Sequence, residues 1–173
     1  MSTLLVALII IAIIAGISFF LIYTSKKHQK KKTAKLLSTC NHIALEHNLN
    51  FSSQEVSTTR VIGVDGISRK LLLVEYKGEE LMHTLIHLED VKKCLVKKNL
   101  NQLSITTGGS KGESYLQSIT LELSFWKNRD SFEISFYDNI SNHIYEISEL
   151  EYKARDWEKM LTKLLSAETR ERA

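Results

Sequence analysis

The sequence contains no proline, and among its 173 residues there are only two cysteines and seven glycines. Without proline, no obligate helix breaker interrupts the long stretches of helix-forming residues. The two thiols, Cys40 and Cys94, are too few for a disulfide framework or for a metal site built from cysteines. Three of the seven glycines lie in one segment, 107–114, which is therefore the only glycine-dense loop.

Acidic residues are missing from residues 1–35, which contain six lysines and so carry a charge of +6. The remaining residues contain 17 Lys and Arg against 20 Asp and Glu, a charge of −3. The net charge of +3 is therefore a local feature of the N-terminal part. A nucleic-acid-binding domain would instead concentrate positive charge over a folded surface, so we expect no nucleic-acid partner.

Charged residues are also missing from residues 4–23, a run of twenty residues of which fourteen are Leu, Ile, Val or Phe. As a helix this run spans about 30 Å, the thickness of a bilayer's hydrocarbon core. The pattern predicts a single N-terminal transmembrane helix within 1–25. No charge precedes the run, and bulky residues rather than small ones end it, which favours an uncleaved signal anchor over a cleaved signal peptide.

Six lysines follow the apolar run, and the positive-inside rule then predicts a single-pass protein of the cell membrane. The short N-terminus would lie outside and the C-terminal domain in the cytoplasm. The lysines are candidates for contact with the membrane surface, or act only as a topology signal: Lys26, Lys27, Lys30, Lys31, Lys32 and Lys35. Ala12 and Gly16 have a small-xxx-small spacing, which makes them candidates for helix–helix contact in a homodimer.

The remainder divides into a basic juxtamembrane helix and connector over 26–58 and one domain over 59–173. Period-two alternation predicts short strands over 60–64, 70–76, 80–87, 91–98, 103–106, 119–125 and 131–137, with a shorter one near 140–147. A helix follows, and its apolar stripe comprises Leu150, Ala154, Trp157, Leu161, Leu164 and Leu165. The predicted fold class is a transmembrane helix followed by an α+β domain, in which seven or eight strands form one antiparallel bent sheet or partial barrel with a C-terminal capping helix.

Three features resemble the pleckstrin-homology-like domain of bacterial membrane-anchored type, over residues 59–165. They are the final helix with Trp157, the alternating strands over 119–125 and 131–137, and the segment Leu88-Glu89-Asp90-Val91-Lys92-Lys93. The resemblance implies a binding or scaffolding role toward lipid headgroups, peptides or proteins. In members that bind inositol lipids the first interstrand loop is basic, whereas here it begins with Asp65. A generic α+β domain is the alternative.

Few residues form patterns that indicate catalysis. Lys111 precedes Gly112 in the loop 107–114, and a strand follows, so the order differs from a P-loop and favours a plain hairpin loop. His83 and His87 share one face of a strand but lie too far apart for a metal site without a fourth ligand. Cys94 is expected to be a core thiol.

These patterns predict no cofactor, no metal and no enzymatic activity. We expect a membrane-tethered cytoplasmic binding domain whose partners are the lipid bilayer and a protein at the membrane. Trp126, expected to be exposed on its strand, is a candidate contact residue. A structural subunit of a membrane complex and an enzyme with an unrecognised site are the alternatives.

Overall fold

The computed structural model describes residues 3–102, 114–126 and 130–171, which form two compact units, Met1–Ile86 and His87–Ala173. The first unit is built from a long helix and four strands: α1 (Thr3–Glu46), β1 (Ser53–Val56), β2 (Arg60–Asp65), β3 (Lys70–Lys77) and β4 (Glu80–His87). The second begins with a 3₁₀ helix and ends with a long α-helix: η1 (Leu88–Asp90), β5 (Val91–Gln102), β6 (Ser114–Phe125), β7 (Phe132–Asp138), η2 (Ile144–Glu146) and α2 (Ile147–Glu171).

The four strands of the first unit form an antiparallel sheet in the order β1-β2-β3-β4. Strands β2 and β3 lie at its centre, and almost every residue of β2 and the first half of β3 is buried. Gly78 in the β3–β4 turn has a φ of +66°, a backbone conformation that glycine adopts without steric cost. Gly63 on β2 lies beneath the ring of Phe51, where a Cβ atom would be only 2.7 Å from a ring carbon.

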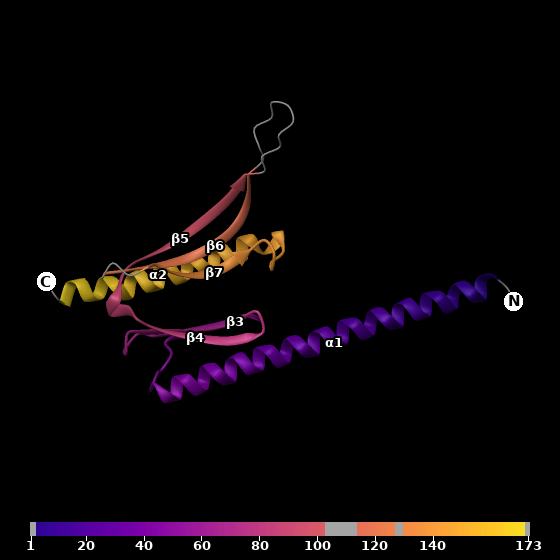
Figure 1. The fold of residues 1–173 in the computed structure, drawn as a ribbon, viewed down its shortest axis with the longest axis horizontal. Coiled ribbons are helices and arrows are strands. Elements are labelled where there is room, and N and C mark those ends of the chain that lie inside the picture. Colours follow the sequence, from indigo (N-terminus) through magenta and orange to yellow (C-terminus); the bar gives the residue numbers. More distant parts are fainter. Residues whose placement is uncertain (1–2, 103–113, 127–129, 172–173) are drawn as a thin grey trace, which may run out of the picture. The chain divides into compact units, whose positions relative to one another are not determined.

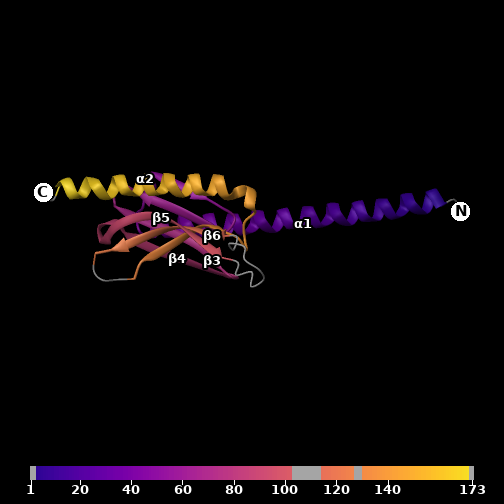
Figure 2. The same ribbon diagram turned by 90° about the horizontal axis from the view of Figure 1, so that it is seen from above.

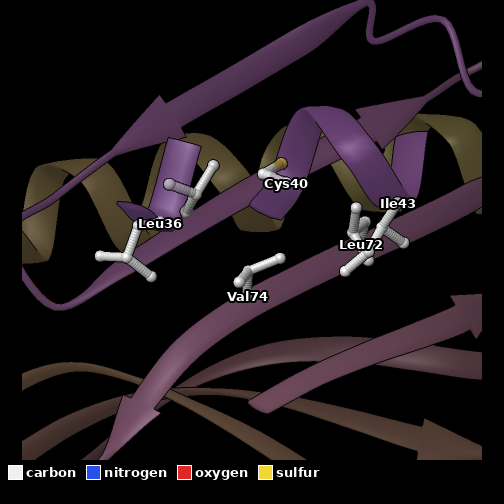
Figure 3. Packing of buried hydrophobic residues seen from close by; sticks show 6 residues of the cluster. Leu36, Cys40, Ile43, Leu72 and Val74 are labelled. Carbon is white, nitrogen blue, oxygen red and sulfur yellow. The ribbon is translucent and has the colours of Figure 1, made fainter. Parts of the chain in front are cut away.

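Helix α1 packs on this sheet through the face that carries Leu36, Cys40 and Ile43. These residues recur at intervals of four and three, so they lie on one side of the helix. Figure 3 shows these residues in one cluster with Leu72 and Val74 of β3. Burying Leu36 and Ile43 contributes about 1.5–3 kcal/mol each, and this favours packing of the C-terminal part of α1 on the sheet.

In the second unit, the strands form an antiparallel sheet in the order β5-β6-β7, and α2 packs against it (Figures 1 and 2). Ala154, Trp157 and Leu161 supply the buried side of α2. Their spacing of three and four residues is the apolar stripe that the sequence predicted for this helix. The predicted C-terminal helix is thus confirmed.

The prediction of one bent sheet or partial barrel of seven or eight strands is wrong. The described residues form two separate antiparallel sheets, of four and three strands. The chain leaves β4 through the 3₁₀ turn η1, in which Leu88 is buried, before β5 begins. Alternation of polar and apolar residues reports which face of a strand is covered, and it carries no information on which strand is the neighbour.

The predicted transmembrane helix is also contradicted. Among the described residues, no helix is both long and apolar enough to cross a membrane. This finding overturns the single-pass signal anchor within 1–25, together with the cell-membrane location and the orientation inferred from it.

Two local predictions differ from the structure. The segment 48–57 was expected to be a connector, but it contains β1, which pairs with β2 from Ser53 opposite Val64 to Val56 opposite Val61. The expected strand near 140–147 is instead a turn followed by η2. The Asp138 side chain accepts the N–H of Ile140 at 2.8 Å and bends the chain there, a local interaction that competes with strand extension.

Candidate binding surfaces

The N-terminal half of α1 extends beyond the sheet that its C-terminal half covers (Figures 1 and 2). Every side chain from residue 11 to residue 20, here called the apolar segment, is exposed. Its large members are between 56% and 74% exposed: Ile11, Ile13, Ile14, Ile17, Phe19 and Phe20. Ten consecutive helical residues point in all directions, so this segment is apolar on every side rather than along one stripe.

Ala12 and Gly16, the candidates for helix–helix contact, both lie within the apolar segment and are exposed. Their spacing of four residues places them on the same side of α1. Among the described residues, no atom lies within 4 Å of the position that a Cβ atom of Gly16 would occupy. The structure thus leaves room at this side for the backbone of another helix.

The predicted lysine cluster divides into two sets. Lys32 points toward the sheet, where its Nζ lies 3.6 Å from Oε1 of Glu79 and 5.7 Å from the ring centre of Tyr76. Four other lysines are exposed: Lys27, Lys30, Lys31 and Lys35. The side chain of Lys26 lies outside the described residues. Sequence reasoning treated the six as one group, whereas one of them, Lys32, contacts residues of β3 and the β3–β4 turn.

A groove of about 450 Å³ runs along α1 in the first unit, and sequence reasoning missed it. One wall is formed by α1, and the other by Thr58 in the turn between β1 and β2. The residues of the α1 wall are Gln29, Lys30, Thr33, Ala34 and Leu37. The spacing of Lys30, Thr33, Ala34 and Leu37, at i, i+3, i+4 and i+7, was the available signal for a continuous helix face.

Neither cysteine has the surroundings of a nucleophile. Cys94 is buried, and burial together with the charge of Glu158 raises the pKa of its thiol to about 12. Burial also raises the pKa of the Cys40 thiol, although a hydrogen bond from Gln54 partly opposes this. Both groups are therefore thiols rather than reactive thiolates at neutral pH. The expectation that Cys94 belongs to the core is confirmed.

The histidines and the glycine-dense loop contribute no defined site. His83 and His87 are both exposed on β4. Among the residues whose placement is described, no group of three His, Cys, Asp or Glu side chains is arranged to hold a metal ion. Residues 107–113 of the loop 107–114 lie outside the described residues.

Trp126 is 63% exposed at the end of β6, as its place beside Phe125 predicted. Its backbone N–H donates to the carbonyl of Asp90 at 3.0 Å, which fixes the main chain beside η1. The Nζ atom of Lys92 lies 5.5 Å from the ring centre, within cation–π range. One face of this indole is thus already engaged within the chain.

Comparison with known proteins gives no further guide to these surfaces. No family model, no curated protein and no solved structure matches the chain.

Proposed function

We propose that this chain is a non-catalytic binding or scaffolding module whose partner is another protein that encloses the apolar segment of α1. The observation that carries the proposal is the exposure of six large apolar side chains on ten consecutive helical residues. Contiguous exposed apolar surface of this kind marks a contact site. A helix that is apolar on every side is stable in water only when it is covered on every side.

The size of the effect favours an enclosing partner. Full burial of a large aliphatic or aromatic side chain is worth about 1.5–3 kcal/mol, so covering the exposed part of six such side chains, 56–74% of each, yields roughly 5–12 kcal/mol. Association itself costs about 4–15 kcal/mol in lost freedom of motion. A partner that touches one side of α1 would gain only part of this free energy and bind weakly, whereas a partner that surrounds the segment gains all of it.

The described surroundings of the titratable groups support a role without catalysis. Both thiols are held protonated by burial, and the carboxylates of Asp65 and Glu151, whose pKa values are lowered, accept hydrogen bonds from neighbouring residues. These are structural roles. The resemblance to pleckstrin-homology-like domains, which dock partners, agrees with the proposal and remains a prediction.

A second copy of the chain is the alternative partner. The open space beside Gly16, on the side that also carries Ala12, favours close approach of an equivalent helix. If two copies were in contact at this side, the leucine side chain of a Gly16→Leu variant would clash with the helix of the other copy. A different protein that surrounds the segment would tolerate that substitution better, since only one side of the helix changes.

Site-specific photo-cross-linking of the full-length chain tests the proposal. A photoreactive phenylalanine analogue replaces Ile17 in one variant and Leu45 in the control, because Leu45 is also exposed on α1 but lies outside the apolar segment. We expect a discrete protein adduct from position 17, absent from position 45 and lost after Ile13→Gln. Adducts at position 17 with lipid alone, or equal adducts at both positions, contradict the proposal. An adduct of twice the chain's mass, lost in Gly16→Leu, identifies a second copy.

A further inference from the structure

The groove along α1 differs from the apolar segment in place and in chemistry. It lies over residues 29–37, where α1 is already packed on the sheet, and Thr58 of the β1–β2 turn forms its far wall. The turn is closed by the N–H of Ser57, which donates to the carbonyl of Arg60 at 2.8 Å. The groove therefore has two walls that belong to ordered elements, and its volume of about 450 Å³ lies in the range of ligand-binding clefts.

The α1 wall of the groove has the form of a helix-docking face. Lys30, Thr33, Ala34 and Leu37 follow one another at i, i+3, i+4 and i+7 along it. Thr33 and Ala34 at the centre are small and permit close approach, while Leu37 supplies a large apolar side chain at one end. A second helix that places apolar side chains at the same spacing would fit its ridge into this groove.

Positive charge lines the solvent side of the groove. Lys27 and Lys30 are three residues apart, so they share the side of α1 that forms the groove wall, and both are exposed. Lys31 is exposed too, but it is four residues from Lys35 and lies on the same side as Lys35. The first acidic residue of the chain is Glu46, so no carboxylate on α1 lies beside them. Within the described part of the chain, neither Lys27 nor Lys30 takes part in an ion pair. Lys35 is exposed as well, but at 100° per residue it lies on the opposite side of the helix from the groove.

We propose that this groove binds an acidic amphipathic helix of a partner protein. Its apolar side chains would fill the space beside Thr33, Ala34 and Leu37, and its Asp or Glu residues would pair with Lys27 and Lys30. The inference rests on the proposed function, because it names the class of partner that a protein-binding module of this kind takes. The groove is a different surface from the apolar segment, so either proposal can be wrong while the other is right.

Fluorescence anisotropy with a labelled synthetic helix tests the groove on the full-length chain. The probe is a peptide of about 18 residues, five helical turns, with Leu at i, i+3, i+4 and i+7 and Glu on both flanks. A matched peptide with Lys in place of Glu tests whether binding requires acidic residues. A second peptide with Gln in place of Leu tests whether binding requires apolar side chains. We expect saturable binding of the first peptide only, weakened by added salt.

Two charge reversals provide the matched comparison. Lys30→Glu lies in the groove wall and Lys35→Glu lies on the opposite side, and both change the net charge by the same amount at an exposed helix position. We expect about a tenfold loss of affinity for Lys30→Glu and less than about a twofold loss for Lys35→Glu. Ala34→Gln, which fills the groove without a change of charge, is expected to weaken binding to a similar extent as Lys30→Glu.

Other outcomes overturn the proposal. Equal losses in Lys30→Glu and Lys35→Glu would show that only the total charge matters. Displacement of the peptide by phosphatidylserine vesicles, with binding of the vesicles at equal strength by the Ala34→Gln variant, would assign the lysines to a lipid surface. Loss of peptide binding after Ile17→Gln would place the peptide on the apolar segment. If Ile17→Gln leaves peptide binding intact while it removes the photo-adduct, the two surfaces are independent.

Discussion

A single carboxylate, Asp65, orders two loops of the first unit. Its Oδ2 accepts the N–H of Asn50 at 2.8 Å, and its Oδ1 accepts the N–H groups of Ile67 and Ser68 at 2.9 and 2.8 Å. The side chain is buried at the end of β2. It therefore joins the segment after α1 to the β2–β3 turn. Burial alone would raise the pKa of the Asp65 carboxyl, but the hydrogen bonds that it accepts outweigh burial and hold the pKa below its usual value.

Replacing Asp65 with alanine is expected to lower the free energy of unfolding by about 3 kcal/mol, because three backbone N–H groups lose a charged acceptor. The folded-state pKa lies below the unfolded one, so this stabilisation is present above a pH of about 4 and is lost as the pH falls through the folded-state value. Urea unfolding of both proteins from neutral pH down to about pH 3 measures the difference, which should shrink at the acid end.

Asp138→Ala is the matched control for Asp65, since the Asp138 carboxylate accepts one N–H, that of Ile140, in an exposed hydrogen bond. We expect a loss of about 1 kcal/mol there. Equal losses in the two variants, or a difference between wild type and Asp65→Ala that does not depend on pH, would contradict the assigned role of Asp65.

The sequence indicated the turn at Asp65-Gly66 but not the buried carboxylate. Turn preference depends on the residue and its immediate neighbours, and it can be read locally. The contact with Asn50 joins residues fifteen positions apart and depends on where α1 ends above the sheet. The groove could not be predicted for the same reason. The spacing of Lys30, Thr33, Ala34 and Leu37 can be recognised in the sequence, but the position of Thr58 opposite them depends on how α1 packs on the sheet.

Glu158 of α2 joins two elements, as Asp65 joins two loops, by accepting a backbone hydrogen bond from β5. Its Oε1 accepts the N–H of Val96 at 2.9 Å, and Val96 lies on β5, an edge strand of the three-stranded sheet. An edge strand presents backbone groups that its own sheet leaves unpaired. Glu158 satisfies one of them and fixes α2 to the sheet, next to the contacts of Trp157 and Leu161.

Glu158→Ala is expected to destabilise the chain by about 1–2 kcal/mol, because the Val96 N–H loses its acceptor in a half-buried position. Glu158→Gln keeps an acceptor oxygen and should cost less. Glu149→Ala on the same helix removes only an exposed ion pair with Lys153 and should change stability by less than about 0.5 kcal/mol. Chemical denaturation followed by the fluorescence of the tryptophans ranks the three. A loss in Glu149→Ala as large as in Glu158→Ala would refute the account.

At the scale of elements, periodicity predicted the C-terminal helix and the strands over 119–125 and 131–137. It failed to predict how the strands divide between sheets, because partner choice depends on the 3₁₀ turn η1 and on which edges the helices cover. Strand β1 was not predicted because its four residues alternate only between exposed and half-buried positions, so the sequence shows no clear apolar face there. The hydropathy of residues 4–23 led to a membrane anchor, which the described residues do not support.

At the scale of the whole molecule, the chain consists of two compact units, and each has a sheet, a helix and buried apolar side chains of its own. The positive charge is concentrated on α1 of the first unit. The second unit contains twelve of the buried apolar residues, on η1, all three strands and α2: Leu88, Val91, Cys94, Ile119, Leu121, Leu123, Ile134, Phe136, Tyr137, Ala154, Trp157 and Leu161. Both proposed binding surfaces lie on the first unit, which leaves the second without an assigned contact.

This division predicts that residues 87–173 fold without the rest of the chain. A chain of this length buries enough surface to form a stable core, and α2 and the three strands supply one. The isolated fragment should show a cooperative thermal transition by circular dichroism and a blue-shifted emission from buried Trp157. Leu161→Asp, which introduces an unpaired charge into the core, should abolish both signals. A fragment without a cooperative transition would mean that the second unit requires the first for its stability, and the two would then form a single folding unit.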